Sequence, residues 1–230
     1  MKSKKSTIWE KNFSNNFKPS FWIKILKRFE KYREDVIISL LPKKGNSIVD
    51  LACGDGELLF KIADRFNNLI GLDIARNRIT NAGKKAVRIK NVKFIFRVAD
   101  LDEGIPLNSG SADIVICQSA ISYFYDTEYF ISEVVRVLKR GGIFILETPN
   151  YAFLTRRISL LFGNLPKTSS FLGYGDGGAL HYFAYATLRD VLNKNGFKVI
   201  RETNSGILPS LRRIWPELLA GDIIMKAIKK

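Results

Sequence analysis

Residues 48–57, which read IVDLACGDGE, constrain the fold of this chain more than any other stretch. Ile48, Val49 and Leu51 are typical of a buried strand, and a helical pattern follows the turn. Gly54 and Gly56 in that turn allow backbone conformations that are costly for other residues, and they let a ligand approach the main chain. The stretch therefore predicts a strand, a tight ligand-binding turn and the start of a helix.

A second acid follows the next predicted strand. Residues 69–73 read LIGLD, so Asp73 ends this strand 19 residues after Gly54. That spacing fits a strand–helix–strand unit in which the acid reaches the ribose of a nucleotide held at the glycine turn. Leu59 stands where a dinucleotide-binding turn has its third glycine, so the sequence disfavours dehydrogenase chemistry.

Strand-like and helical patterns alternate along the rest of the chain. They predict a doubly wound, mostly parallel sheet of seven strands, with helices on both faces and an antiparallel last strand. A helix is expected over 58–66, a helix after the N-cap Asp126, and another from Leu188, because Thr187 and Asp190 have capping-box spacing. The closing strands, 197–202 and 222–228, are expected to form a hairpin without a helix between them.

One domain with lids is expected. Trp9 and Phe13 belong to a pattern of bulky residues that recurs every four positions, and a second helical pattern ends before Pro42. Residues 1–44 are therefore predicted to form a helical lid or cap. Residues 45–230 are predicted to form the main domain, with an insertion on the substrate side over 151–186.

The net charge of +15 is confined to the two ends of the chain. Residues 1–47 carry 12 basic against 4 acidic residues and residues 151–230 carry 12 against 5, while the middle carries 13 of each. The basic ends suit an anionic substrate, a membrane surface or nucleic acid, or they serve solubility alone. A cytoplasmic protein is expected, because no apolar run reaches the roughly 20 residues that span a bilayer and no signal-peptide pattern is present.

The first motif resembles that of the class I, seven-stranded S-adenosylmethionine-dependent methyltransferases. Their acid-x-Gly-x-Gly-x-Gly pattern matches residues 50–56, with Ala52 where the family usually has its first glycine. The resemblance implies S-adenosylmethionine as cofactor, Asp73 as the ribose ligand and Asp100 as the ligand of the adenine amine. The residues implied to bind the cofactor are Asp50, Ala52, Cys53, Gly54, Gly56, Asp73, Ile74, Asp100, Leu101 and Gln118. No metal is expected, since Cys53 and Cys117 lack metal-ligand spacing.

The methyl acceptor is less constrained. The segment around His181 is similar to a subgroup of methyltransferases that act on glycans and small molecules, and His181, the only histidine, is a candidate general base. Trp9, Phe13, Tyr123 and Tyr182 are candidates for the substrate pocket. O-methylation of a small, lipid-linked or glycan-linked acceptor, with or without negative charge, is therefore expected, and peripheral membrane contact stays open. The alternatives are methylation of RNA on ribose or base and a non-catalytic cofactor-binding scaffold.

Overall fold

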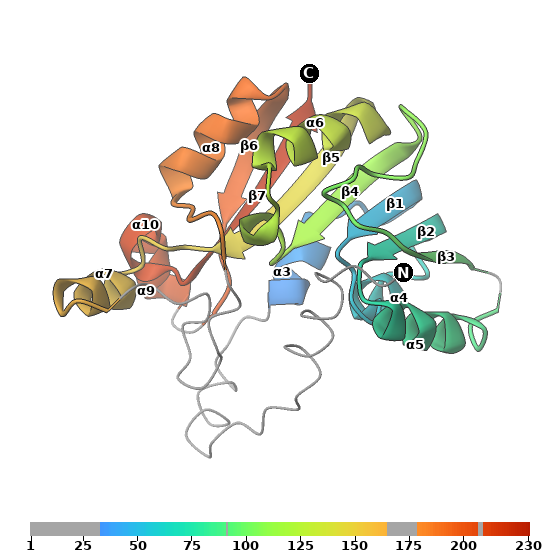
Figure 1. Cartoon of the computed structure of the whole chain (residues 1–230), viewed down its shortest axis with the longest axis horizontal. Helices are drawn as coiled ribbons and strands as arrows, with labels where there is room; N and C mark the ends of the chain where they lie inside the picture. Colours follow the sequence, from blue (N-terminus) through green and yellow to red (C-terminus); the bar gives the residue numbers. More distant parts are fainter. Residues whose placement is uncertain (1–32, 91, 165–178, 207–208) are drawn as a thin grey trace, which may run out of the picture.

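The computed structural model describes residues 33–90, 92–164, 179–206 and 209–230. Its centre is a seven-stranded sheet with the order β3-β2-β1-β4-β5-β7-β6 (Figure 1). The strands are β1 (Gly45–Leu51), β2 (Phe66–Asp73), β3 (Lys93–Val98), β4 (Ala112–Gln118), β5 (Leu138–Pro149), β6 (Phe197–Thr203) and β7 (Asp222–Lys229).

Within this sheet β7 alone runs against the other strands. It pairs antiparallel with both β5 and β6, whereas β1 to β5 pair in parallel. The predicted doubly wound sheet with an antiparallel last strand is confirmed. From β1 the chain first builds outward through β2 to β3 and then returns to place β4 on the other side of β1, so the strand order reverses between β1 and β4. Ligands of open α/β sheets bind at such a switch point.

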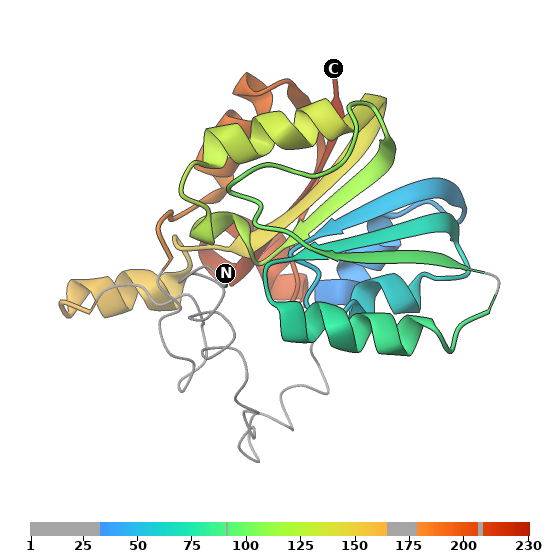
Figure 2. The ribbon, with the colours of Figure 1, turned by 45° about the vertical axis from the view of Figure 1, so that its right-hand side comes forward.

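Helices cover both faces of the sheet, as predicted. In Figure 2, α6 lies on one face and α4 and α5 lie on the other. The apolar core is split accordingly, with Phe130 and Leu188 in one cluster and Ile37, Leu59 and Ile116 in the second. The helices are α3 (Arg33–Leu40), α4 (Glu57–Lys61), α5 (Arg76–Ala86), the 3-10 turn η1 (Ile121–Tyr123), α6 (Thr127–Val137), α7 (Leu154–Leu161), α8 (Tyr185–Lys194), α9 (Pro209–Ile214) and α10 (Pro216–Leu219).

Three local predictions were wrong. The helix expected over 58–66 ends at Lys61, and Phe66 already belongs to β2. The connection between β6 and β7 contains α9 and α10 instead of a plain loop. Helix α8 begins at Tyr185, so Thr187 lies inside it, where its hydroxyl accepts a hydrogen bond of 2.9 Å from the N–H of Ala184.

The predicted lid over 1–44 is described only from residue 33 onward, so Trp9 and Phe13 lie outside the described residues. Within the described part, Val36, Ile37 and Leu40 of α3 are buried against the sheet. The lid role and the boundary at 44 stay predictions. In the portion of the chain that the structure describes, no helix is long and apolar enough to cross a membrane.

Candidate functional site

The turn between β1 and α4 is held in left-handed backbone conformations. Ala52, Gly54 and Gly56 have φ angles of 61°, 55° and 73°. A Cβ added at Gly54 would lie 2.9 Å from Nη1 of Arg78, and one added at Gly56 would lie 2.7 Å from the ring of Phe96. Both the dihedral angles and the lack of space therefore favour glycine at these two positions, whereas Ala52 adopts the same conformation with a Cβ.

The Asp73 carboxylate at the end of β2 fixes this turn. Its Oδ2 accepts a hydrogen bond of 2.8 Å from the N–H of Gly54, and its Oδ1 accepts one of 2.8 Å from the N–H of Ala75. Burial raises the pKa of Asp73, and the two backbone donors oppose this shift. Each carboxylate oxygen has a second lone pair, so the carboxylate can also accept from two hydroxyl groups of a ligand.

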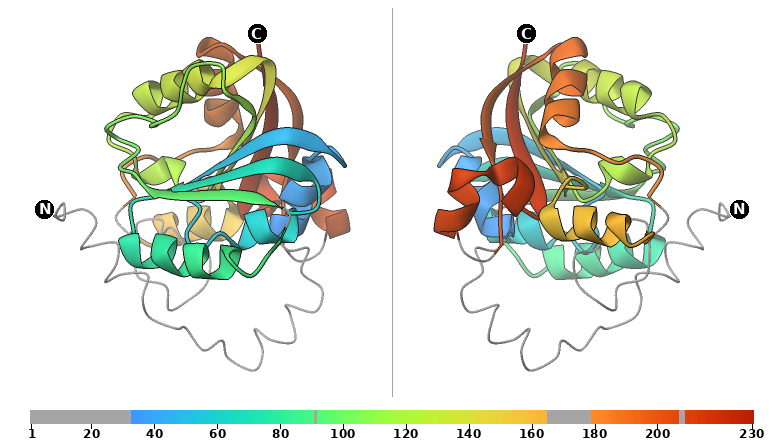
Figure 3. Two further views of the ribbon diagram at one scale, coloured as in Figure 1. Left: turned by 90° about the vertical axis from the view of Figure 1, so that its right-hand side faces the viewer. Right: turned by 90° about the vertical axis from the view of Figure 1, so that its left-hand side faces the viewer.

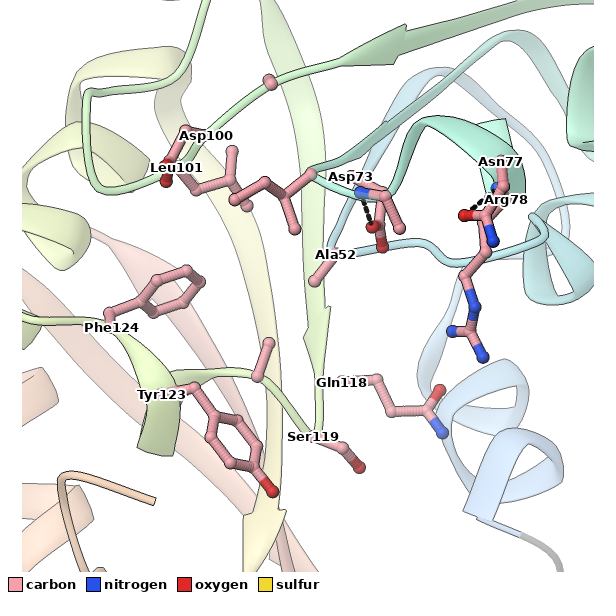
Figure 4. Close-up of a pocket in the computed structure, with 14 residues that line it drawn as sticks. Ala52, Asp73, Asn77, Arg78, Asp100, Leu101, Gln118, Ser119, Tyr123 and Phe124 are labelled. Atoms are coloured by element: carbon pink, nitrogen blue, oxygen red, sulfur yellow. Dashed lines mark hydrogen bonds between the residues drawn. The ribbon is translucent and has the colours of Figure 1, made fainter. Parts of the chain in front are cut away.

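A cavity of about 270 Å³ opens beside this acid, in front of the carboxyl ends of β1 to β4. It lies at the reversal of strand order, where the fold predicts a ligand. Figure 4 shows Asp73 and Arg78 on one side of the cavity and Tyr123 and Phe124 on the other. The wall consists of Ala52, Asp73, Ile74, Ala75, Asn77, Arg78, Ala99, Asp100, Leu101, Gln118, Ser119, Ala120, Tyr123 and Phe124.

Asp100 supplies a second carboxylate to the same wall. It follows β3, and Figure 4 places it with Leu101 on the far side of the cavity from Arg78. Its Oδ1 accepts from the N–H of Asp102 at 3.2 Å. An acid at each of two neighbouring strand ends suits a ligand with hydroxyl donors at one point and an amine donor at another, as a nucleoside has.

The structure brings together most of the residues expected at the cofactor. The expected residues on the cavity wall are Ala52, Asp73, Ile74, Asp100, Leu101 and Gln118. Asp50, Cys53, Gly54 and Gly56 are not on that wall; they lie in β1 and the turn behind it. Their contact with the cofactor, like that of the wall residues, stays a prediction.

Asn77 and Arg78 line the cavity although sequence reasoning did not single them out. Both lie in the first turn of α5, directly after Asp73, and Nε of Arg78 is 3.9 Å from Oδ2 of Asp55 in the glycine turn. A basic residue one helical turn after the strand-end acid is the signal that could have identified Arg78. Phe124 follows β4, far from α5 in the sequence, so only the folded structure shows that it lies on the same cavity wall.

The β4 side of the cavity carries a constrained serine. Ser119 has a φ of 55°, its N–H donates to the carbonyl of Glu147 at 3.0 Å, and its Oγ donates to Oε2 of Glu147 at 2.6 Å. Glu147 is buried, burial raises its pKa, and the guanidinium of Arg33 opposes that shift. Two bonds to one residue therefore keep the Ser119 hydroxyl in place at the cavity wall.

Of the residues expected at the acceptor, Tyr123 lines the cavity, whereas His181 and Tyr182 are not on its wall. The N–H of His181 donates to the carbonyl of Ser122 at 3.1 Å, and its Nε2 lies 3.3 Å from the carbonyl oxygen of Tyr125. Tyr182 packs edge-on against Tyr151, with ring centroids 4.5 Å apart. His181 thus contacts the segment that contains Tyr123 without lining the cavity itself.

Among the described residues, no group of three or more His, Cys, Asp or Glu side chains is arranged to hold a metal ion. The arrangement instead combines a glycine turn with carboxylates after β2 and β3. A sequence-family profile described as "Methyltransferase domain" matches residues 42–175, more than half of the chain. The chain belongs to the class I S-adenosylmethionine-dependent methyltransferases. The carboxylates and the glycine turn fit that cofactor.

Curated relatives of this methyltransferase cover different shares of it. A probable S-adenosylmethionine-dependent methyltransferase of Mycolicibacterium smegmatis is 32% identical over 120 residues, which are 51% of this chain and 44% of the relative. A demethylmenaquinone methyltransferase of Lactobacillus johnsonii is 27% identical over 191 residues, covering 76% of this chain and 78% of the relative. The match thus spans less than half of the mycobacterial relative's length.

Solved structures show the same fold at low sequence identity. The magnesium protoporphyrin IX methyltransferase of Synechocystis PCC 6803, with bound SAH, aligns with a TM-score of 0.68 and 18% identity over 100% of this chain and 96% of that one. An S-adenosylmethionine-dependent methyltransferase of Mesorhizobium loti aligns with a TM-score of 0.62 and 19% identity over 84% of this chain and 96% of that one.

Proposed function

We propose that this methyltransferase methylates an oxygen of a small, lipid-linked or glycan-linked acceptor, with or without negative charge. The observation that carries this proposal is the composition of the cavity: its β2–β3 side offers two carboxylates, and its β4 side offers the hydroxyls of Ser119 and Tyr123 beside the ring of Phe124. Hydroxyls and aromatic rings suit a small organic acceptor, since pockets for such ligands combine apolar walls with a few polar groups.

The roles of the residues follow from their places. Asp73 would accept from the ribose hydroxyls and Asp100 from the adenine amine, while Gln118 would contact the amino-acid end of the cofactor. S-adenosylmethionine supplies an activated methyl group with a good leaving group. The protein therefore has mainly to align the acceptor and exclude water. Tyr123 would position the acceptor, and residues 1–44 and 151–186 would close over it.

His181 is the proposed general base. It would accept the proton of the acceptor hydroxyl, because it is the only histidine and imidazole exchanges protons near neutral pH. Its Nε2 lies 3.3 Å from the carbonyl oxygen of Tyr125, so the ring would have to turn from this contact toward the acceptor. Tyr182, packed on Tyr151, would then border the acceptor on the same side.

Calorimetry with S-adenosylhomocysteine tests the cofactor part of the proposal. Asp73→Ala removes both the expected ribose ligand and the acceptor that holds Gly54, so affinity should fall by at least about tenfold. Asp64→Ala, in an exposed turn away from the cavity, is the matched control and should bind like the parent. Unchanged binding by Asp73→Ala would contradict the assignment.

A metabolite extract incubated with methyl-labelled cofactor tests the acceptor part. A labelled methyl ether or ester should form, and His181→Ala should lower turnover by about 10²-fold without changing S-adenosylhomocysteine affinity. Full activity of the His181→Ala enzyme would show that His181 is not the general base. Label found only on carbon or nitrogen would contradict O-methylation.

RNA is the second candidate acceptor. An mRNA cap guanine-N(7) methyltransferase of Oryza sativa is 29% identical over 161 residues, covering 60% of this chain, and the basic ends of the chain suit a phosphate backbone. Binding to RNA predicts a steep loss of affinity between low and moderate salt, because counterions are released on binding. Salt-independent binding, or none to total RNA, would remove this candidate. The family match leaves no reason to retain the scaffold alternative.

A further inference from the structure

Helices α7 and α9 bury arginine and expose their apolar side chains. In α7 the one buried residue is Arg156, and in α9 it is Arg212. By contrast, Leu161 is 84% exposed and Ile214 is 79% exposed. Helices on a globular core show the opposite pattern, because burial of apolar area stabilises the fold while burial of a charge opposes it. Packing within this fold therefore does not explain why these apolar side chains are exposed.

The orientation of α7 is fixed by its buried arginine. Nη1 of Arg156 donates to the carbonyl of Asn150 at 2.5 Å and to that of Gly221 at 3.3 Å. Its guanidinium also lies over the ring of Tyr151, 5.0 Å from the ring centroid. These contacts offset the desolvation of the cation. They hold α7 in an orientation that leaves its leucine and isoleucine side chains exposed.

A buried arginine also fixes the orientation of α9. The guanidinium of Arg212 donates to the carbonyls of Ser205 and Gly206 and to Oδ1 of Asn204. Because the cation satisfies backbone carbonyls of the chain entering the helix, the neighbouring Leu211 is left on the outside. Two separate helices thus use a buried arginine to present apolar residues.

The two helices lie on one side of the molecule. Nδ2 of Asn150, just before α7, donates to the carbonyl of Glu217 in α10 at 2.9 Å, and Arg156 bonds Gly221 just after α10. Figure 1 shows α7, α9 and α10 near the end of β5, and the right-hand view of Figure 3, which faces this side of the molecule, shows α9 and α10 on one side of the strands and α7 on the other. We call this surface the apolar face; its exposed members are Leu154, Ile158, Leu160, Leu161, Phe162, Leu211, Ile214 and Trp215.

The charged residues around the apolar face indicate which kind of partner it binds. Arg157 and Arg213 are exposed beside it, and Glu217 is the one acid in α7, α9 and α10. Residues 151–230 carry 12 basic against 5 acidic residues. Aliphatic side chains, a tryptophan and arginines together are the composition of protein surfaces that lie in an anionic lipid interface. A second copy of this chain would bring like charges together, and nucleic acid offers no surface for leucine and isoleucine.

We propose that the apolar face docks on the surface of a bilayer containing anionic lipids. The leucine, isoleucine and phenylalanine side chains would enter the boundary between head groups and acyl chains, Trp215 would lie at the head-group level, and Arg157 and Arg213 would contact lipid phosphates. This contact does not depend on the acceptor proposed above. It would place the carboxyl end of β5 and the nearby cavity next to the membrane, where an acceptor could be a lipid.

Sedimentation with vesicles tests this docking. The full chain should pellet with vesicles of phosphatidylcholine and phosphatidylglycerol, and less with phosphatidylcholine alone. Phe162→Glu and Ile214→Glu, each at a side chain 79% exposed, should each lower the partition into anionic vesicles by about tenfold, because each loses apolar burial and adds a repelled charge. Val87→Glu is the matched control: Val87 is 86% exposed at the end of α5, away from the apolar face, and its variant should bind like the parent.

Several results would overturn the proposal. These are no sedimentation of the parent, equal binding by all three variants, or a self-associated parent that becomes monomeric in Phe162→Glu while vesicle binding stays unchanged. Each variant must keep the parent's thermal midpoint and S-adenosylhomocysteine affinity. If Phe162→Glu fails this test, Leu161→Glu replaces it on the same helix.

Discussion

Ala52 and Ser119 adopt left-handed backbone conformations at the cavity wall, with φ angles of 61° and 55°. For a residue with a Cβ this conformation costs about 1–2 kcal/mol. The fold retains this unfavourable conformation because the chain turns sharply at the end of β1 and again at the end of β4. The cavity lies between these two turns. Strain at these two residues is therefore a consequence of where the ligand site lies.

Replacing Ala52 with glycine should stabilise the protein. Gly removes the steric cost of the left-handed conformation but increases the entropy of the unfolded chain, so a net gain of about 0.5–1 kcal/mol is expected. Denaturant unfolding measures it. Ala86→Gly, in the last turn of α5, is the matched control and should instead cost roughly 0.5–1 kcal/mol. Equal destabilisation by both substitutions would show that Ala52 is not strained.

Asp50 should make stability depend on pH. Burial, together with the charge of Asp73, raises the pKa of Asp50 to about 8. The folded chain therefore keeps a proton that the unfolded chain releases near pH 4, so the free energy of unfolding falls as pH rises from about 4 to about 8. Asp50→Asn removes this titration, and the variant should exceed the parent by at least about 2 kcal/mol at pH 8.

Urea unfolding of both proteins at pH 4 and pH 8 checks this prediction. At pH 4 the Asp50 carboxyl is protonated in the fold, so the two proteins should have similar stability there. A smaller slope remains in the variant, because burial also raises the pKa values of Asp73 and Glu147. If the stability of the parent fell between pH 4 and pH 8 by no more than that of the variant, the prediction would be contradicted.

Sequence alone identified those site residues that follow a strand directly. Asp73 ends a predicted strand, and the resemblance to the family implied Asp100; because both follow neighbouring parallel strands, which end at one edge of the sheet, they converge there. Ser119 depends on more: its hydroxyl is held by Glu147, 28 residues later, through the pairing of β4 with β5. Such contacts are set by register between strands, which local pattern does not encode.

Among the elements, α6 provides a direct test of helix capping. Oδ1 of Asp126 accepts from the N–H of Tyr129 at 2.9 Å, as the sequence predicted. Asp126→Ala removes this cap and should cost about 1 kcal/mol of unfolding free energy, whereas Asp126→Asn keeps an acceptor and should cost much less. Denaturant midpoints of the three proteins measure the difference. Equal losses in the two variants would mean that charge rather than capping matters.

The lengths of other elements could not be derived from periodicity. Leu59, Ile62 and Phe66 fit one helical stripe, yet Ile62 and Ala63 bond i–3 carbonyls as α4 ends, and Phe66 pairs with Gly45 in the sheet. The ring of Phe66 occupies the space that a Cβ at position 45 would need, with a separation of 2.5 Å. An apolar residue is thus compatible with either a helix or a strand. The residues that it contacts in the folded protein determine which of the two forms.

The short helices before β7 did leave a signal in the sequence. Pro209 and Pro216 are the first residues of α9 and α10. Proline is favoured at the first helical position because it lacks the N–H that would be unbonded there. The expectation of a hairpin without a helix between its strands did not take this signal into account.

For the whole molecule, the reversal of strand order divides the sheet into β1 to β3 and β4 to β7, with the cavity across the division. Its wall takes residues from the segments after β1, β2, β3 and β4. A ligand that fills it is in contact with both halves at once, so binding should stabilise them together. The mass-action gain is about 2.7 kcal/mol at a ligand concentration of 100 times Kd.

Hydrogen exchange followed by mass spectrometry resolves that coupling by segment. S-adenosylhomocysteine should slow exchange in peptides that contain Ala52, Asp73, Asp100 and Ser119, because all four lie on the wall. Peptides from α7 and α9, outside the wall, provide the internal comparison and should exchange as before. Asp73→Ala should lose protection in all four peptides together, since one binding event protects them. Protection confined to the peptides after β1 and β2 would show instead that the ligand contacts only one half, and that the β4 side of the cavity belongs to the acceptor alone.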